Sequence, residues 1–192
     1  MAKSKSVVFL DRDGTINEEV NYLSTIEQFK FIDGAVDAIR LLNEAGLLAI
    51  LITNQAGVAR GYYDEDRVAK IHDFMEKQLQ RSGARLDGIY YCPHHPTAGL
   101  GKYKIDCQCR KPNPGLLEKA AADLHIDLSK SYVIGDKISD LQAGLAVGCR
   151  TILVRTGYGK EVEKALPEDG LQPDYIADDV LEAVGWILGS LK

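Results

Sequence analysis

Four acidic residues lie in two short pairs, each close behind an apolar run. Asp11 and Asp13 follow residues 7–10, and Asp136 and Asp140 follow residues 132–134. Carboxylates at the end of a buried segment are costly unless a cation or hydrogen-bond donors hold them. Magnesium in proteins is bound by one or two carboxylates together with water and phosphate oxygens. The two pairs therefore indicate a magnesium site, although aspartates also form turns and cap helices.

A hydroxyl group and a lysine complete this pattern. Thr53 follows the apolar run 47–52, and Lys111 stands just before Pro114, a residue that suits the first turn of a helix. A threonine hydroxyl and a lysine ammonium group bind phosphoryl oxygens. Taken singly, Thr53 could be an ordinary loop residue and Lys111 could belong to a solvated basic turn. Together with the acids they predict a phosphoryl-transfer site.

The cysteines form the second set of residues whose spacing indicates chemistry. Three of the four fall within 18 residues, in Cys-Pro-His-His at 92–95 and Cys-Gln-Cys at 107–109. Four nitrogen and sulfur ligands with no open position are typical of a structural zinc site. We expect the ligands to be Cys92, His94, Cys107 and Cys109. Alternatives are His95 in place of His94, and a disulfide or incidental buried cysteines in place of zinc.

The zinc loop 92–109 is directly followed by two cations. Closing it on a metal would place Arg110 and Lys111 at the mouth of the phosphate site. Cys149 is expected to be a small core residue, and His72 and His125 to be surface or packing residues.

These residues need a scaffold, and apolar runs alternate with helical patterns along the chain. We predict strands over 7–10, 47–52, 86–91, 132–134, 151–154 and 174–177. We predict helices over 34–45, 64–81 with an aspartate N-cap, 114–124, 138–147 and 180–188. Segments 12–33, 92–113 and 157–173 are expected to be irregular. Such alternation favours a parallel sheet covered on both faces, with the active site beyond the carboxyl ends of its strands.

Composition excludes several classes of protein. The 192 residues are 45% hydrophobic and 27% charged, with a net charge of −5, as in ordinary globular proteins rather than disordered or membrane proteins. There is no overall basic field to bind nucleic acid, and no apolar run long enough for a signal peptide or a membrane span. We expect one domain over 1–192, a cytoplasmic location, a small-molecule substrate and a monomer.

The ordered motifs resemble those of the haloacid dehalogenase superfamily of phosphatases, over about residues 6–145. They are Asp11-x-Asp13-Gly14-Thr15, Thr53, Lys111 and Gly135-Asp136-x-x-x-Asp140. The resemblance implies a Rossmann-like α/β fold, with Asp11 as the nucleophile and Asp13 as the acid and base. Thr53 and Lys111 would hold the phosphoryl oxygens. Magnesium would be bound by Asp11, by the Asp13 backbone carbonyl and by Asp136, with Asp140 orienting the other groups.

The zinc loop resembles one branch of that superfamily, the D-glycero-D-manno-heptose-1,7-bisphosphate 7-phosphatases, and their relatives the histidinol phosphatases. The long spacing between the two ligand pairs favours the heptose branch, whose product feeds nucleotide-activated heptose synthesis for surface glycans. The resemblance implies no separate cap domain. It implies sugar contacts at Glu19, Val20, Asn21, Tyr22, Asn54, Gln55, Ala56, Arg110 and Lys137. Histidinol-phosphate hydrolysis and a catalytically inactive zinc-stabilised binding module remain alternatives.

Overall fold

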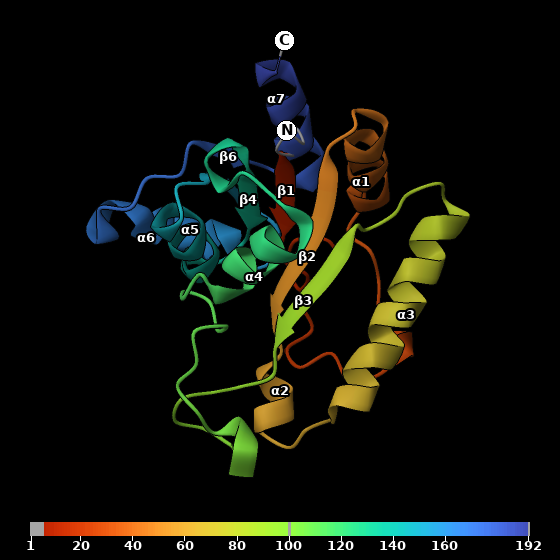
Figure 1. Ribbon diagram of the computed structural model, residues 1–192, viewed down its shortest axis with the longest axis vertical. Coiled ribbons are helices and arrows are strands. Elements are labelled where there is room, and N and C mark those ends of the chain that lie inside the picture. The colour runs from red at the N-terminus through yellow and green to blue at the C-terminus, as the bar shows by residue number, and fades with distance from the viewer. Residues whose placement is uncertain (1–5, 100, 192) are drawn as a thin grey trace.

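Six parallel strands form a single sheet in the computed structural model, which describes residues 6–99 and 101–191 (Figure 1). Their order is β3-β2-β1-β4-β5-β6. The strands are β1 (Val7–Leu10), β2 (Leu48–Asn54), β3 (Gly88–Cys92), β4 (Tyr132–Gly135), β5 (Arg150–Val154) and β6 (Tyr175–Ala177). All six predicted strands are confirmed, as is the parallel sheet.

Helices cover both faces of the sheet. Helices α1 (Ala35–Glu44), α3 (Glu65–Arg81) and α7 (Val180–Ser190) share one core cluster, and α4 (Gly115–Leu124) and α5 (Ile138–Ala146) contribute to the other. Strand β1 shows the reason: Val8 and Leu10 belong to the first cluster, and Val7 and Phe9 to the second. Alternate side chains of a strand point to opposite faces, so an unbroken apolar run is buried on both sides.

Two helices were not predicted. Helix α6 (Gly159–Asp169) lies within 157–173, so the prediction of an irregular segment there is wrong. This stretch is rich in charged residues, and its buried Leu166 packs against Leu141 of α5 and Leu153 of β5. The short α2 (Ala56–Ala59) follows β2. Single 3₁₀ turns lie at Ile26–Gln28, Gly101–Tyr103 and Leu128–Lys130.

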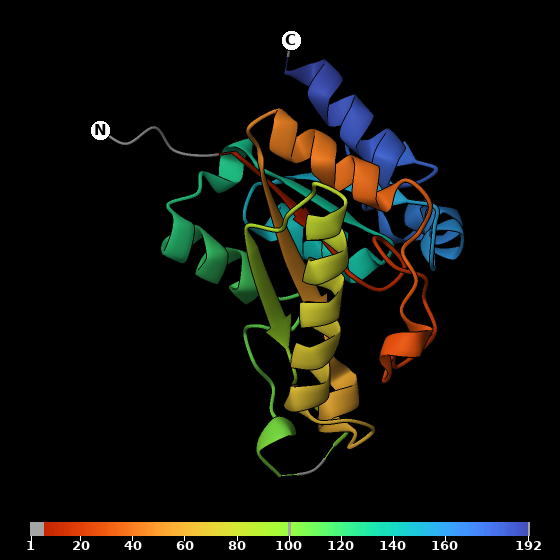
Figure 2. The same ribbon diagram turned by 90° about the vertical axis from the view of Figure 1, so that its right-hand side faces the viewer.

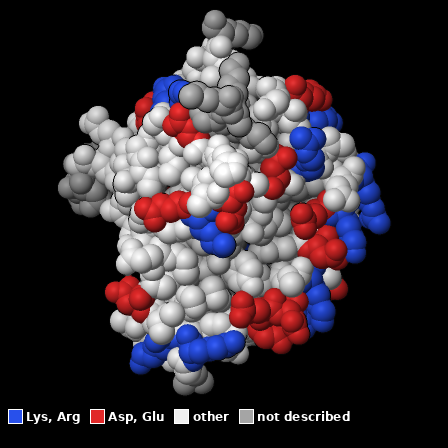
Figure 3. Space-filling view, in the orientation of Figure 1, with Lys and Arg blue, Asp and Glu red and all other residues white. Residues whose placement is uncertain are grey.

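The connections that follow β2 and β3 reach past the carboxyl ends of these strands (Figure 1). Residues 93–114 extend beyond β3 at one end of the molecule, and α7 lies at the opposite end (Figures 1 and 2). Lysine and arginine side chains gather at the lower edge of the face shown in Figure 3, over the 93–114 loop. Within 6–99 and 101–191, no helix is both long enough and apolar enough to cross a membrane.

Candidate active site

The strand order brings the two acidic pairs together. Strands β1 and β4 are neighbours, and the Asp11 N–H donates to the Ile134 carbonyl at 3.0 Å. The chain leaves β1 and β4 on opposite sides of this point, where open α/β sheets bind their ligands. As a result, carboxylate oxygens of Asp11, Asp136 and Asp140 lie within 4.8 Å of one another, and all three residues are buried.

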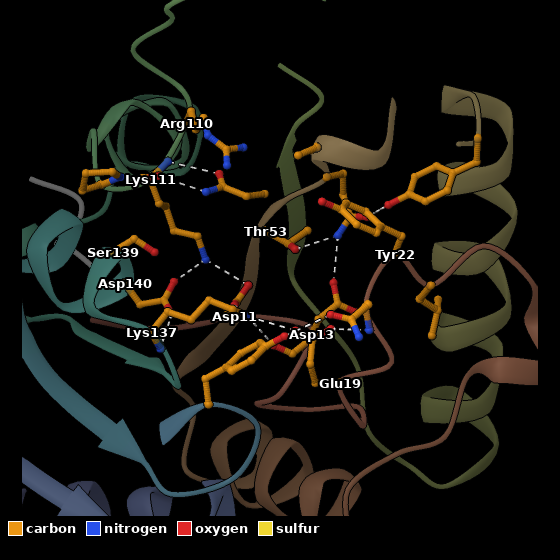
Figure 4. Close-up of a pocket in the computed structure, with 18 residues that line it drawn as sticks. Asp11, Asp13, Glu19, Tyr22, Thr53, Arg110, Lys111, Lys137, Ser139 and Asp140 are labelled. Atoms are coloured by element: carbon orange, nitrogen blue, oxygen red, sulfur yellow. Dashed lines mark hydrogen bonds and ion pairs between the residues drawn. The ribbon is translucent and has the colours of Figure 1, made fainter. Parts of the chain in front are cut away.

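Lys111 lies between two of these acids (Figure 4). Its Nζ is 2.9 Å from Asp11 Oδ1 and 2.5 Å from Asp140 Oδ1, and it donates to the Ile52 carbonyl at 2.9 Å. Burial lowers the pKa of Lys111, but the charges of Asp11 and Asp140 outweigh it and leave the pKa above its usual range. Lys111 is therefore a buried, permanently charged group. Asp140 also accepts the Lys137 N–H at the start of α5, so it caps that helix as well.

The ammonium group of Lys137 marks the point where the three expected magnesium ligands converge. Its Nζ lies 3.2 Å from the Asp13 carbonyl, 3.3 Å from Asp136 Oδ1 and 3.9 Å from Asp11 Oδ2. It also contacts Glu19 Oε2 at 3.1 Å. Oxygen donors gathered around one cation fit the ligand preference of magnesium.

Asp136 is the acid most strongly affected by this crowding. Burial away from water, together with the charges of Asp11 and Asp140, raises its pKa to about 7 in spite of the opposing charge of Lys137. A divalent cation beside it would favour its ionised form, because an opposite charge stabilises a carboxylate.

The turn after β5 contacts both Asp136 and the loop that follows β1. The Tyr158 N–H donates to Asp136 Oδ2 at 2.9 Å, and the Thr156 hydroxyl donates to the Gly14 carbonyl at 2.6 Å. Gly157 has φ +54°, and a Cβ there would lie 2.2 Å from Asp136 Oδ2. The glycine is therefore needed for close approach. This turn was not predicted to belong to the site.

Asp13 is held by a separate set of donors. Arg12 Nη2 contacts Asp13 Oδ2 at 2.9 Å, and Gln55 Nε2 donates both to that oxygen at 3.0 Å and to Thr53 Oγ1 at 2.9 Å. Burial raises the pKa of Asp13, but the Arg12 charge and hydrogen bonds from Asn17 and Gln55 hold it below its ordinary value. Asp13 is therefore a carboxylate at neutral pH.

The segment that carries Arg110 and Lys111 is fixed at both ends. Asn54 donates through Nδ2 to the Lys111 carbonyl at 3.0 Å and accepts the Lys111 N–H at 3.1 Å. Arg110 Nη1 donates to the His94 carbonyl at 3.1 Å. Asn54 is expected to contact a sugar, but in the structure both polar atoms of its side-chain amide bind the Lys111 backbone and position that residue.

Cys92, His94, Cys107 and Cys109 form one cluster at the base of the 93–114 loop. The sulfur and Nδ1 atoms are separated by 3.2 to 3.8 Å. A tetrahedron with metal–sulfur bonds of about 2.3 Å has edges of about 3.8 Å, so the spacing fits zinc. His95 instead accepts the Ala98 N–H through Nδ1 at 2.9 Å.

The predicted residues surround a cleft of about 430 Å³. Asp11, Asp13, Thr53 and Lys111 line it, together with these expected sugar contacts: Glu19, Asn21, Tyr22, Asn54, Gln55, Ala56, Arg110 and Lys137. Val20 is not among the lining residues, and it lies on the surface.

Comparison with known proteins places this site in a family. Residues 108–183 match the family model described as HAD-hydrolase-like. The chain is 44% identical over 187 residues to the D-glycero-beta-D-manno-heptose-1,7-bisphosphate 7-phosphatase of Pasteurella multocida, covering 96% of this chain and 98% of that one. It belongs to this HAD-like phosphatase family. The Escherichia coli K12 relative of the same name is 42% identical over 192 residues, covering 100% of this chain and 92% of its own length.

A solved structure agrees with this assignment. D,D-heptose 1,7-bisphosphate phosphatase from B. bronchiseptica, complexed with magnesium and phosphate, has a TM-score of 0.85 and 33% identity. The match covers 96% of this chain and 99% of that one. The predicted superfamily and fold class are thereby confirmed, and the chain is a phosphoric monoester hydrolase.

Several residues that line the cleft of this phosphatase were not singled out in the sequence as contacts. They are Leu23, Tyr63, Pro112, Ser139 and Tyr158. Tyr63 donates from its hydroxyl to Gln55 Oε1 at 2.9 Å, so it braces the amide that contacts Asp13. In the sequence, Tyr63 is marked only by its place beside Asp64, the predicted N-cap of the helix over 64–81. Asp64 does cap this helix, since it accepts the Arg67 N–H at 2.9 Å.

Proposed function

We propose that this phosphatase hydrolyses the 7-phosphate of D-glycero-D-manno-heptose 1,7-bisphosphate, in the synthesis of nucleotide-activated heptose for surface glycans. The observation that carries the proposal is the near full-length match to relatives of that name, together with their expected catalytic groups around one cleft. Histidinol-phosphate hydrolysis is not favoured, since the relatives and the solved structure described above are named heptose bisphosphate phosphatases.

Asp11 is the proposed nucleophile. A carboxylate oxygen attacks phosphorus, the bond to the sugar oxygen breaks, and an aspartyl phosphate forms. Lys111 stays charged and fixed between Asp11 and Asp140, so it can bind a phosphoryl oxygen without reorganising. The Thr53 hydroxyl, which is buried and accepts from Gln55, offers its proton to a second phosphoryl oxygen.

Asp13 is the proposed general acid and base. In the first half-reaction it protonates the leaving sugar oxygen, and in the second it deprotonates the water that attacks the aspartyl phosphate. Arg12 keeps Asp13 ionised in the resting site, which is the form needed as a base. An arriving phosphate places negative charge beside Asp13 and raises its proton affinity for the first step.

Two metals are proposed. Asp11, the Asp13 carbonyl and Asp136 would hold Mg²⁺, which when bound neutralises charge on the phosphoryl group. The four residues of the zinc cluster would hold a structural Zn²⁺. Its position next to Arg110 means that the metal would order the cationic segment at the mouth of the cleft.

Substrate selection is assigned to the rim of the cleft. Arg110 is the first choice for the second anionic group of a bisphosphate, and Lys137 is the second. The remaining proposed contacts are Glu19, Val20, Asn21, Tyr22, Asn54, Gln55 and Ala56. We further propose that the enzyme is cytoplasmic and monomeric, and that residues 1–192 fold as one domain.

The test compares kcat/KM for the α and β anomers of heptose 1,7-bisphosphate with that for histidinol phosphate. We expect the heptose substrates to be preferred, and a clearly higher value on histidinol phosphate would overturn the assignment. Asp11→Asn should abolish turnover and leave the circular dichroism spectrum unchanged. Turnover retained in that variant would refute the nucleophile, and no turnover in the unaltered protein would favour an inactive binding module.

A further inference from the structure

Arg12 is among the largest fully buried side chains of the described residues. An arginine is almost never fully buried without partners, and here all but one of the side-chain contacts lead to the site. Nε and Nη2 both donate to Asp13 Oδ1, at 3.2 and 3.0 Å, and Nη2 also donates to Gln55 Oε1 at 3.1 Å. The guanidinium thus fixes the orientation of the Asp13 carboxylate through a fork of hydrogen bonds.

The remaining contact of this guanidinium comes from outside the catalytic loops. Arg12 Nη1 lies 3.1 Å from Nε2 of His72, a residue of α3 that is 60 positions further along the chain. An arginine can only donate, so Nε2 must be the unprotonated nitrogen of a neutral ring. Burial and the Arg12 charge lower the pKa of His72 to about 3, which keeps the ring neutral at physiological pH.

Loss of this acceptor would leave one buried arm of the guanidinium without a partner. A buried donor with no acceptor is unfavourable, so the group would turn toward another acceptor or toward water. Any such rotation moves the two arms that hold Asp13.

We propose that His72 is a positioning residue for the reaction, which acts through Arg12 to hold the Asp13 carboxylate in line with the leaving oxygen. The inference rests on the proposed role of Asp13 as the general acid. His72 itself does not line the cleft, so it has no direct route to the substrate.

The experiment uses two substrates whose leaving groups differ in their need for a proton. A sugar alkoxide must be protonated as it leaves, whereas p-nitrophenolate is stable without a proton. The value of kcat/KM reports the first half-reaction, in which Asp13 acts as an acid. It is measured for both substrates with the unaltered enzyme and with His72→Leu, His72→Gln and Asp13→Ala.

Because general acid catalysis is typically worth about 100- to 10,000-fold, a misaligned acid should cost His72→Leu about tenfold or more on the sugar bisphosphate. The loss on p-nitrophenyl phosphate should be less than about twofold, since that leaving group needs little assistance. His72→Gln keeps an acceptor and should recover most of the activity on the sugar. If His72→Leu gives no soluble protein, His72→Phe replaces it, since it keeps a ring against Tyr91 without an acceptor.

Equal losses on both substrates would show a merely structural role and overturn the inference. So would full activity of His72→Leu on the sugar. Asp13→Ala separates this failure from failure of the proposed function. If Asp13→Ala discriminates between the leaving groups and His72→Leu does not, Asp13 stands as the acid and His72 is rejected. If Asp13→Ala shows no discrimination, the role of Asp13 itself is wrong.

Discussion

Lowering the pH from 7 to 5 should destabilise the folded protein through His72. The unfolded chain binds a proton at this residue below its ordinary pKa of 6.5, but the folded chain does so only below about 3. Between these values the unfolded state holds more protons, so acid favours unfolding. The stability is fully present above pH 6.5 and falls by about 1.4 kcal/mol per pH unit down to about pH 3. The loss from pH 7 to pH 5 is then about 2 kcal/mol.

Urea unfolding measures this contribution of His72 to stability. It is carried out on the unaltered protein and on His72→Gln, at pH 7, 6 and 5 and at fixed magnesium. Glutamine does not titrate, so between pH 7 and pH 5 the free energy of unfolding of the unaltered protein should fall by about 2 kcal/mol relative to that of His72→Gln. The Tyr91 ring faces His72, and its pKa is raised to about 12 by burial and Glu65, so Tyr91 stays neutral in this range. The pKa of Asp13 is held low, and Asp136 titrates in both proteins alike. Parallel pH dependence would refute a neutral, buried His72.

Three further outcomes test the metal sites and their supports. Gly157→Ala should displace Asp136 and lower both magnesium affinity and activity, the latter by about 100-fold for a misplacement near 1 Å. Gly170→Ala, at φ +67° with open space around its Cβ, is the control for backbone strain alone, and an equal loss there would contradict the contact argument. The Lys137 ammonium repels a cation bound among the same oxygens, and a unit charge within 4 Å is worth about 1 kcal/mol even in water, so Lys137→Met should bind magnesium about fivefold or more tightly by calorimetry while kcat/KM falls. Magnesium affinity that stays unchanged, as expected for the exposed control Lys30→Met, would show that Lys137 does not oppose magnesium binding. Cys107→Ser should lose zinc by elemental analysis, increase proteolysis within 92–111 and raise KM, while the sheet stays largely intact. Zinc content equal to that of the control Cys149→Ser would argue against the zinc site.

The parts of the fold that could be predicted are those fixed by short-range pattern. Short apolar runs of three to six residues that helical patterns separate indicate strands of a parallel sheet, so the polar residues that follow them are expected to meet at one edge. Asp11 and Asp136 come together for this reason alone. Helix α6 escaped prediction because charged residues dominate its sequence and few apolar ones mark a buried face, and its place depends on Leu166 meeting two distant leucines.

The supports of the site were harder to predict for a physical reason. Arg12 lies within an obvious motif, but arginines are usually exposed, and nothing local indicates that this one is buried. His72 falls on the apolar face of α3, where a packing histidine and a hydrogen-bonded one have the same spacing. The contact between them spans 60 residues and exists only after the sheet has formed. Likewise, the close approach of Gly157 to Asp136 is a property of two neighbouring strand ends.

The ion pairs of the cleft contain more acids than bases. Three cations, Arg12, Lys111 and Lys137, are paired with five carboxylates, those of Asp11, Asp13, Glu19, Asp136 and Asp140. With all five carboxylates ionised, these ion pairs carry an excess of two negative charges, which attracts a divalent cation and repels a phosphate dianion. Each ligand therefore improves the site for the other, and by linkage the gain in affinity is the same in both directions. The enzyme thus favours the state that holds metal and substrate together over either state that holds one alone.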